Sequence, residues 1–416
     1  MDNYVIEMGK LAKKASYELN KLDKNKKNGI LLAVSEGLLK EKEVIFLENE
    51  KDVENGKNNN LSNAMIDRLI INEKRLISMS EGLITMASLE DPIGEVLNGF
   101  TANSGLNITK VRVPIGVIGM IYESRPNVTV DAMGLAFKSG NAIILRGGSE
   151  AIHSNRILMK IINKYGVEAG LPIGACQLIE KTDRKYVKDL ITMNDYVDVV
   201  IPRGGKGLKK RIVSDSTVPT IITGSGLCHM FVDDEYDLKN GVDIVVNAKV
   251  QRPGVCNAIE TLLVHKDYAA KFLPAVIKEL KNQGVEVVGC EETIKYVENI
   301  EKATEEDFDT EYLDLKISVK VVENIDDAIK HVNKYTTNHS ESILTNNYEN
   351  AERFLNEIDA STVYVNSSTR FTDGGEFGFG GEIGISTQKL HARGPMGLKE
   401  LTTYKYLVRG NGQIRK

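Results

Sequence analysis

Residues 142–149 read Ala142-Ile143-Ile144-Leu145-Arg146-Gly147-Gly148-Ser149, an apolar strand that runs straight into a glycine turn. A helical pattern follows over residues 151–166. The same order recurs on both sides, with apolar strands over 117–122 and 176–179. Strand–helix alternation continues from residue 114 to residue 213, which is typical of a parallel sheet covered by helices on both faces.

The segments that flank this unit have different patterns. Residues 1 to about 90 show helical periodicity, with Lys- and Asn-rich loops between the helices. Residues 98–113 alternate loosely around Gly99 and Gly105, which predicts a hairpin. A short strand is expected near the end of the chain, over 402–408.

A second α/β unit is predicted after residue 228. A helix over 237–249 leads to a turn and then to an apolar strand over 261–264. Further strands are expected at 285–288, 318–322 and 342–344, and further helices at 268–283, 325–332 and 348–358. The strand over 362–365 is expected to return to the first unit.

Size and composition indicate an ordinary globular protein. The chain has 416 residues, 42% of them hydrophobic and 27% charged, and at roughly 150 residues per domain two or three domains are expected. The net charge of −5 gives no overall field to attract nucleic acid or anionic lipid. The N-terminus has no secretory pattern and no apolar run approaches roughly 20 residues, so a cytoplasmic protein that does not cross a membrane is expected.

One cysteine lies in a setting that suits a nucleophile. Cys256 follows a Pro-Gly turn in Gln251-Arg252-Pro253-Gly254-Val255-Cys256-Asn257 and precedes a strand. A thiolate held there could attack an activated carbonyl and form a thioester. Alone, such a cysteine is more often a small buried hydrophobic residue. The four cysteines are far apart and lack metal-ligand spacing, so no metal is expected.

Two glycine-rich turns join strands to helices. Arg146, Gly147, Gly148 and Ser149 lie where open α/β sheets bind ligands, and Arg146 could hold the 2′-phosphate of NADP. Gly204 and Gly205, in Arg203-Gly204-Gly205-Lys206-Gly207, could admit a pyrophosphate to a helix N-terminus. Plain tight turns remain an open alternative for both.

Several polar residues are weaker candidates for the site. Glu311 could accept hydrogen bonds from a ribose, although a surface role is more common for such a residue. Gly- and Phe-rich residues 371–381 could wall a cleft. Four arginines beside Pro or loop segments could bind phosphate or carboxylate, or be structural: Arg125, Arg252, Arg370 and Arg393.

Taken together, these segments resemble the aldehyde dehydrogenase superfamily, in order and over nearly the whole chain. The segments that carry the resemblance most specifically are Val113-Pro114-Ile115-Gly116-Val117-Ile118-Gly119, Tyr122-Glu123-Ser124-Arg125-Pro126-Asn127-Val128-Thr129, Lys138-Ser139-Gly140-Asn141, Gln251-Arg252-Pro253-Gly254-Val255-Cys256-Asn257 and Ser386-Thr387-Gln388-Lys389-Leu390-His391-Ala392-Arg393-Gly394-Pro395-Met396-Gly397.

The resemblance implies an aldehyde dehydrogenase-like α/β fold with two parallel-sheet domains and a small β oligomerisation element. An NADP-binding domain is then expected over 1–97 and 114–228, with a return segment 366–397. A catalytic domain over 229–365 would carry Cys256. The hairpin 98–113 and the tail 398–416 would form the oligomerisation element of a dimer or tetramer.

The resemblance also assigns roles to single residues. Cys256 matches the nucleophile and Glu311 the glutamate that holds the nicotinamide ribose. Arg146 falls at the strand-end residue near the adenosine ribose, and Gly204 and Gly205 fall under the pyrophosphate. Backbone N–H groups near Cys256 are expected to stabilise the oxyanion, with Asn127 or Asn257 as candidate side chains.

One departure from the family pattern narrows the chemistry. Hydrolytic members carry a glutamate that activates water, whereas Ile222-Thr223-Gly224-Ser225-Gly226 has no carboxylate. The resemblance therefore implies NADPH-dependent reduction of L-glutamyl 5-phosphate, in proline biosynthesis. It also implies that phosphate, instead of water, reacts with the thioester. A hydrolytic relative and a catalytically silent scaffold are the alternatives. Because the chain has no kinase segment, glutamate 5-kinase must make the acyl phosphate, and a transient contact with it is left open.

Overall fold

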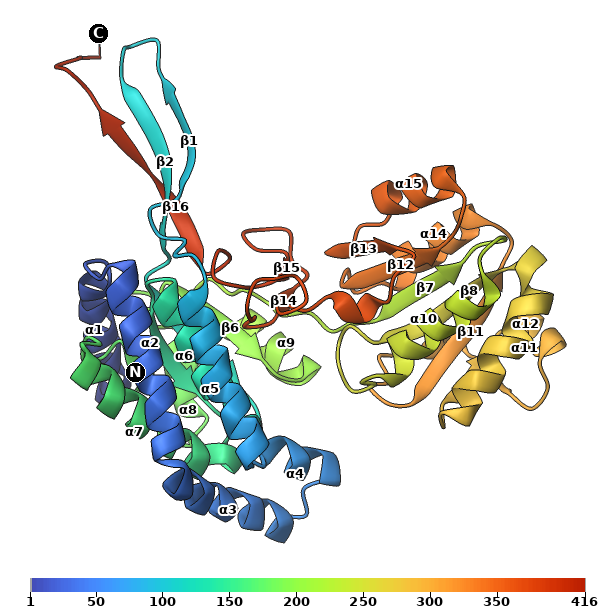
Figure 1. Cartoon of the computed structure of the whole chain (residues 1–416), viewed down its shortest axis with the longest axis horizontal. Coiled ribbons are helices and arrows are strands. Elements are labelled where there is room, and N and C mark those ends of the chain that lie inside the picture. The colour runs from blue at the N-terminus through green and yellow to red at the C-terminus, as the bar shows by residue number, and fades with distance from the viewer. Residues whose placement is uncertain (1, 416) are drawn as a thin grey trace. The chain divides into compact units, whose positions relative to one another are not determined.

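Two parallel sheets form separate cores, one in each of the two units of the chain (Figure 1). The computed structural model describes residues 2–415, except for the side chains of Ala64 and Lys206. The first unit contains residues 2–222, 378–384 and 396–415, and the second contains 223–377 and 385–395. The two predicted parallel-sheet α/β domains are thereby confirmed.

The sheet of the first unit has four parallel strands in the order β5-β4-β3-β6. Every residue of β3 and β4 is buried, as expected for strands covered on both faces. The strands are β3 (Val117–Tyr122), β4 (Ala142–Arg146), β5 (Cys176–Leu178) and β6 (Val199–Arg203). The helices of this unit are α1 (Asn3–Leu19), α2 (Lys24–Lys40), α3 (Lys42–Asn58), α4 (Asn63–Leu69), α5 (Glu73–Ser88), α6 (Asn127–Lys138), α7 (Ile152–Ala169), α8 (Lys185–Ile191) and α9 (Lys206–Asp215).

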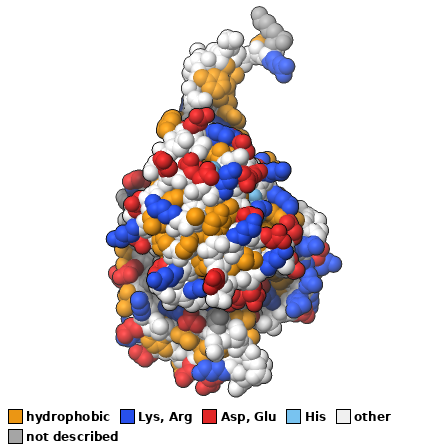
Figure 2. Space-filling view, turned by 90° about the vertical axis from the view of Figure 1, so that its right-hand side faces the viewer, with side chains coloured by type: hydrophobic (Ala, Val, Ile, Leu, Met, Phe, Trp, Pro, Cys, Tyr) orange, Lys and Arg blue, Asp and Glu red, His pale blue; other side chains and the backbone are white. Residues whose placement is uncertain are grey.

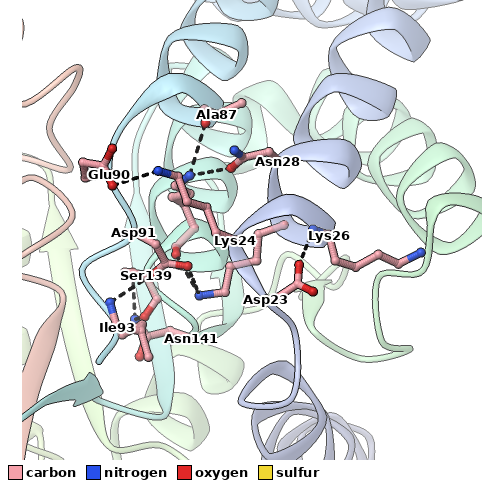
Figure 3. A network of polar contacts seen from close by, with 12 residues as sticks. Asp23, Lys24, Lys26, Asn28, Ala87, Glu90, Asp91, Ile93, Ser139 and Asn141 are labelled. Carbon is pink, nitrogen blue, oxygen red and sulfur yellow. Dashed lines mark hydrogen bonds and ion pairs between the residues drawn. The ribbon is translucent and has the colours of Figure 1, made fainter. Parts of the chain in front are cut away.

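Two buried lysines, Lys27 and Lys138, join α2 and α5 to the end of α6. Figure 3 labels their partners Asn28, Ala87 and Asp91. The Lys27 ammonium pairs with Asp91 Oδ2 at 2.8 Å. The Lys138 ammonium donates to the Ala87 carbonyl at 3.2 Å and to Asn28 Oδ1, and burial lowers the pKa of Lys138. The segment 138–141 therefore has a structural role, because the Lys138 ammonium binds the carbonyl of Ala87 near the end of α5.

A three-stranded antiparallel sheet extends from the helices of the first unit in Figure 1. It contains β1 (Val96–Thr101), β2 (Asn107–Pro114) and β16 (Thr402–Arg409), which confirms the predicted hairpin and tail strand. Directly paired residues of antiparallel strands share a face. One face of this sheet accordingly carries the exposed side chains of Phe100, Tyr404, Tyr406 and Val408.

The second unit is built on seven parallel strands in the order β10-β9-β11-β8-β7-β12-β13. The strands are β7 (Cys228–Val232), β8 (Ile259–His265), β9 (Glu286–Gly289), β10 (Glu301–Lys302), β11 (Lys316–Val322), β12 (Ser340–Leu344) and β13 (Thr362–Val365), with the short pair β14 (Ile385–Ser386) and β15 (Gly394–Pro395) apart from them. The helices are α10 (Leu238–Val250), α11 (Lys266–Asn282), α12 (Glu291–Tyr296), α13 (Glu305–Phe308), α14 (Ile325–Tyr335) and α15 (Tyr348–Glu357). The central strand β8 is wholly buried and begins just after Cys256.

The prediction that residues 362–365 return to the first unit is wrong. The strand β13 pairs in parallel with β12, with Ser340 opposite Thr362, and completes the edge of the second sheet. Residues 366–377 and 385–395 also belong to the second unit, so only part of the predicted return segment 366–397 does return, and the second unit begins at residue 223 instead of 229. A short β-branched run fits the edge of either sheet, and the connection through α15 decides between them.

Candidate active site

Cys256 lies on a turn between the end of α10 and the start of β8. The Ala258 N–H donates to the Val255 carbonyl at 3.1 Å and closes the turn. Cys256 is half-buried, whereas the sheet strand that follows is completely buried. The turn therefore holds the thiol at the surface of a rigid core, as a nucleophile requires.

The segment before β7 packs directly on the backbone of Cys256. A Cβ atom at position 226 would overlap the Cys256 carbonyl oxygen, so only glycine fits there. The Gly226 N–H donates to Glu311 Oε1 at 2.7 Å, and the Leu227 N–H donates to Thr337 Oγ1 at 2.9 Å. Gly226 thus lies against the nucleophile turn, and the carboxylate that reaches it comes from Glu311.

Two of the other cysteines, Cys176 and Cys228, are buried in settings that keep them as thiols. The Cys228 thiol donates to the Cys256 carbonyl at 3.2 Å, and burial raises the pKa of Cys228 well above its usual value. Burial also raises the pKa of Cys176 to about 12. Cys290 is half-buried, with its sulfur 3.3 Å from Thr293 Oγ1. Because a thiolate is the reactive form, buried Cys176 and Cys228 are poor candidates for a nucleophile.

A loop from the far end of the unit closes over the nucleophile turn. Asn257 Nδ2 donates to the Thr372 carbonyl at 2.9 Å and to the Arg370 carbonyl at 3.3 Å. Thr369 Oγ1 donates to the Asn257 carbonyl at 2.7 Å. The Asn257 amide therefore holds this loop through two backbone carbonyls.

Arg370 lies beside the nucleophile turn. Its guanidinium donates to Asn257 Oδ1 and, from Nε at 2.8 Å, to Gln251 Oε1. Burial lowers the pKa of Arg370 and the nearby Arg252 guanidinium lowers it further, whereas Asp373 and, to a smaller extent, Cys256 oppose this effect. Two arginines and the candidate nucleophile are thus close together in one unit, and this arrangement favours an anionic substrate.

Arg393 has a different setting from the other candidate arginines of the second unit. Its Nη2 donates to Asp359 Oδ1 at 2.8 Å and to the Asp359 carbonyl at 3.2 Å. The Lys389 ammonium pairs with the same carboxylate at 2.6 Å. Arg393 therefore fixes the segment between β14 and β15 against the end of α15.

In the first unit, the end of β4 is a rigid corner. Arg146 is buried and donates to the Gly147 carbonyl at 2.6 Å and to the Thr182 carbonyl at 2.7 Å. Added Cβ atoms would overlap Asn155 at Gly147 and Glu150 at Gly148. Ser149 is exposed and begins a short 3₁₀ turn. The glycines are thus required by close packing within the protein itself.

The second glycine turn has a carboxylate at the helix N-terminus. The Gly205 N–H donates to Glu123 Oε2 at 2.9 Å, just before α9, and a Cβ at Gly204 would lie 2.7 Å from the same carboxylate. Arg125 is half-buried two residues after Glu123. Asn127 is exposed at the start of α6, where its Nδ2 donates to Asp131 Oδ2 at 2.9 Å.

The structure therefore divides the predicted site residues between the two units. The residues in the first unit are Arg125, Asn127, Arg146, Gly147, Gly148, Ser149, Gly204 and Gly205. Those in the second unit are Arg252, Cys256, Asn257, Glu311, Arg370 and Arg393. Sequence reasoning missed Gly226 and Thr337 as supports of the turn. Their only signal was the glycine content of residues 222–226, which does not reveal what packs against it.

Surface and ligand features limit the kinds of partner. Across residues 2–415, no helix is long and apolar enough to cross a membrane. The described side chains also contain no cluster of three or more metal-ligating residues. On the face drawn in Figure 2, acidic and basic side chains are interspersed, so that face has no extended surface of one charge.

The sequence matches the aldehyde dehydrogenase family over residues 3–294 and 317–407, and the chain belongs to that family. It is 57% identical over 407 residues to the gamma-glutamyl phosphate reductase of Caldanaerobacter subterraneus subsp. tengcongensis, covering 98% of each chain. It is also 57% identical over 415 residues to that of Clostridium perfringens, covering 100% of each. The crystal structure of the Thermotoga maritima gamma-glutamyl phosphate reductase is 50% identical and covers 99% of both chains with a TM-score of 0.96. Within the family the chain belongs with the gamma-glutamyl phosphate reductases and is an oxidoreductase.

Proposed function

We propose that this protein uses NADPH to reduce L-glutamyl 5-phosphate to L-glutamate 5-semialdehyde and phosphate, through a thioester on Cys256. The observation that carries the proposal is that residues 222–226, whose last residue Gly226 packs on the backbone of Cys256, hold no carboxylate. The placement of Arg370 and Arg252 near the thiol supports an anionic acyl donor. The names of the similar reductases point to the same substrate.

The reaction has two halves, and Cys256 acts in both. Its thiolate attacks the acyl carbon, the bond from that carbon to the phosphate oxygen breaks, and phosphate leaves with the electron pair. Backbone N–H groups beside Cys256 stabilise the oxyanion, and Arg370 and Arg252 stabilise the leaving phosphate. A bound reduced nicotinamide would supply hydride chemistry at this stage, and Cys256 would hold the acyl group as a thioester to receive it. The carbon–sulfur bond then breaks, which releases the aldehyde and restores the thiolate.

A hydrolytic dehydrogenase is the main alternative, and the reverse reaction distinguishes the two. With glutamate 5-semialdehyde and NADP, steady-state turnover should depend on added phosphate, because residues 222–226 offer no base to activate water. Without phosphate, NADPH formation should stop after about one equivalent per active site. Stopped-flow absorbance in phosphate-free buffer measures both phases. Equal rates with and without phosphate, with free glutamate accumulating, would falsify this proposal.

The ends of β4 and β6 fit a dinucleotide. Arg146 Nε is buried and, among the described residues, has no hydrogen-bond partner. Added Cβ atoms at Gly205 and Gly207 would meet no atom within 4 Å, so the N-terminus of α9 is open on that side. Gly204 and Gly205 would hold the pyrophosphate. The Glu123 carboxylate would have to leave the Gly205 N–H when a phosphate approaches.

NADP preference is expected to depend on Arg184, which lies near Arg146 at the end of β4. Arg184 is exposed and close enough to Arg146 to help lower its pKa, after the larger effect of burial. Arg184→Ala should raise the NADPH KM about tenfold and leave NADH unchanged, because a charge-assisted phosphate contact contributes about 1.5–3 kcal/mol. Arg146→Ala should weaken both cofactors, because it releases the Gly147 and Thr182 carbonyls. A selective loss of NADPH in Arg146→Ala alone would instead place the 2′-phosphate on Arg146.

We propose that the exposed face of β1, β2 and β16 joins copies of this chain into an oligomer. Phe100, Tyr404, Tyr406 and Val408 expose apolar surface on that face, and such patches mark interaction sites. Tyr406→Glu should shift the protein to monomer in sedimentation equilibrium at micromolar concentration. Lys405→Glu, on the opposite face of the same strand, is the matched control and should not. An unchanged mass for Tyr406→Glu would exclude this face.

A further inference from the structure

A buried ion pair lies behind the nucleophile turn, outside the residues assigned above. The Lys249 ammonium, at the end of α10, is 2.6 Å from Glu260 Oε2 on β8. The two side chains are 0% and 1% exposed. Burial raises the pKa of Glu260 to about 7 and lowers the pKa of Lys249. A buried pair of this kind contributes little net stability, so stability alone does not explain its presence here.

The second oxygen of Glu260 holds the loop that carries Glu311. Glu260 Oε1 accepts a hydrogen bond from the Leu313 N–H at 3.2 Å. Leu313 has a φ of 54°, in the left-handed region that a leucine adopts only when its surroundings impose it. Between them, the Tyr312 hydroxyl contacts Ser318 Oγ at 2.8 Å and Asp307 Oδ1 at 3.0 Å. Each residue from 311 to 313 is thus fixed by a separate contact.

This loop in turn positions the backbone of Cys256. Glu311 Oε1 accepts the Gly226 N–H at 2.7 Å, and Gly226 packs without space against the Cys256 carbonyl. The Leu313 carbonyl also lies 3.6 Å from where a Cβ at Gly254 would stand, so the loop borders the nucleophile turn directly. The contacts form one continuous series from Lys249 to Cys256, all within the second unit.

We propose that Glu260, with Lys249 as its counterion, is a positioning residue that holds the 311–313 loop and, through Gly226, the nucleophile Cys256. Glu260 touches neither substrate nor cofactor in this assignment. Its effect on turnover rests on the proposed function, whereas its effect on the Gly226 N–H does not.

Two variants separate the hydrogen bond from the ion pair. In Lys249→Met, Glu260 takes up a proton, because a buried carboxyl without a cation is neutral, and its oxygen still accepts from Leu313. In Lys249→Met/Glu260→Leu, that acceptor is lost and no unpaired charge is buried. The double variant should exchange the Gly226 N–H for deuterium at least about tenfold faster than the single variant. Its kcat should be at least about tenfold lower than that of the single variant, with the KM for the acyl phosphate within about threefold.

Lys249→Met/Glu260→Gln is the matched control, because the amide oxygen restores an acceptor for Leu313. It should behave like Lys249→Met in both measurements. The proposal would be overturned if the three variants agreed within twofold in both Gly226 exchange rate and kcat. It would also be overturned if Lys249→Met had a kcat as low as that of Lys249→Met/Glu260→Leu. A wild-type enzyme that does not turn over L-glutamyl 5-phosphate would refute the proposed function alone, since the exchange measurement needs no substrate.

Discussion

Cys256→Ser should lose reductase turnover by about 10³-fold or more while the protein remains folded. Serine keeps nearly the same volume, so the turn between α10 and β8 should be retained. The serine hydroxyl is almost fully protonated at neutral pH. Residues 222–226 hold no carboxylate that could act as its base, and burial keeps Cys228 in the thiol form. The measurement is steady-state NADPH oxidation with L-glutamyl 5-phosphate, together with NADPH binding by fluorescence.

Other cysteines provide the controls for this variant. Cys290→Ser changes a half-buried thiol in the same unit, and Cys176→Ser changes a buried thiol in the first unit. Both should retain turnover within about threefold, once any loss of folded protein is corrected for. Substantial activity in Cys256→Ser would mean that the acyl group is reduced without a covalent intermediate on this residue.

Gly226→Ala should lower kcat nearly as far as loss of the nucleophile. The added methyl group would overlap the Cys256 carbonyl, and neither backbone can move away without breaking the Gly226–Glu311 hydrogen bond or the Cys228–Cys256 contact. A displacement of about 1 Å at a reacting group costs about 10²-fold in rate, so a loss of 10²-fold or more is expected.

The control for Gly226→Ala comes from the nucleophile turn itself. At Gly254 the nearest atom to an added Cβ is the Leu313 carbonyl at 3.6 Å, an ordinary contact distance. Gly254→Ala should therefore retain kcat within about threefold, with thermal unfolding close to wild type. If Gly226→Ala were as active as Gly254→Ala, the close packing on Cys256 would have no role in catalysis.

Local patterns were enough to predict most of the elements. The apolar strands before glycine turns and the helical periodicities are local signals, and β3, β4, β8 and α7 follow them. The hairpin of β1 and β2 could also be predicted from its alternating apolar and polar residues and from its glycines. The assignment of β13 to a sheet failed, because an edge strand is selected by its connection and not by its composition.

The site could be predicted only as a set of residue types. The roles of Cys256 and Glu311 were predicted from the family resemblance and that of Arg370 from its loop setting, and these roles stay predictions. The contacts that hold them join residues far apart in the chain, such as Gly226 with Glu311 and Asn257 with Thr372. Arg146 was predicted to bind a phosphate and Asn257 to stabilise the oxyanion. The structure shows Arg146 Nη1 and Nη2 and Asn257 Nδ2 donating to backbone carbonyls, which a single sequence does not reveal.

The pairing of β16 with β2 also determines when the three-stranded sheet can form during translation. The strand β16 leaves the ribosome long after β2, and the two pair from Thr402 opposite Pro114 to Arg409 opposite Asn107. Until β16 has emerged, that edge of β2 has no strand to pair with, and an isolated two-stranded ribbon is marginal in water. The nascent chain therefore carries an open β edge, a site for non-native association, until β16 is released.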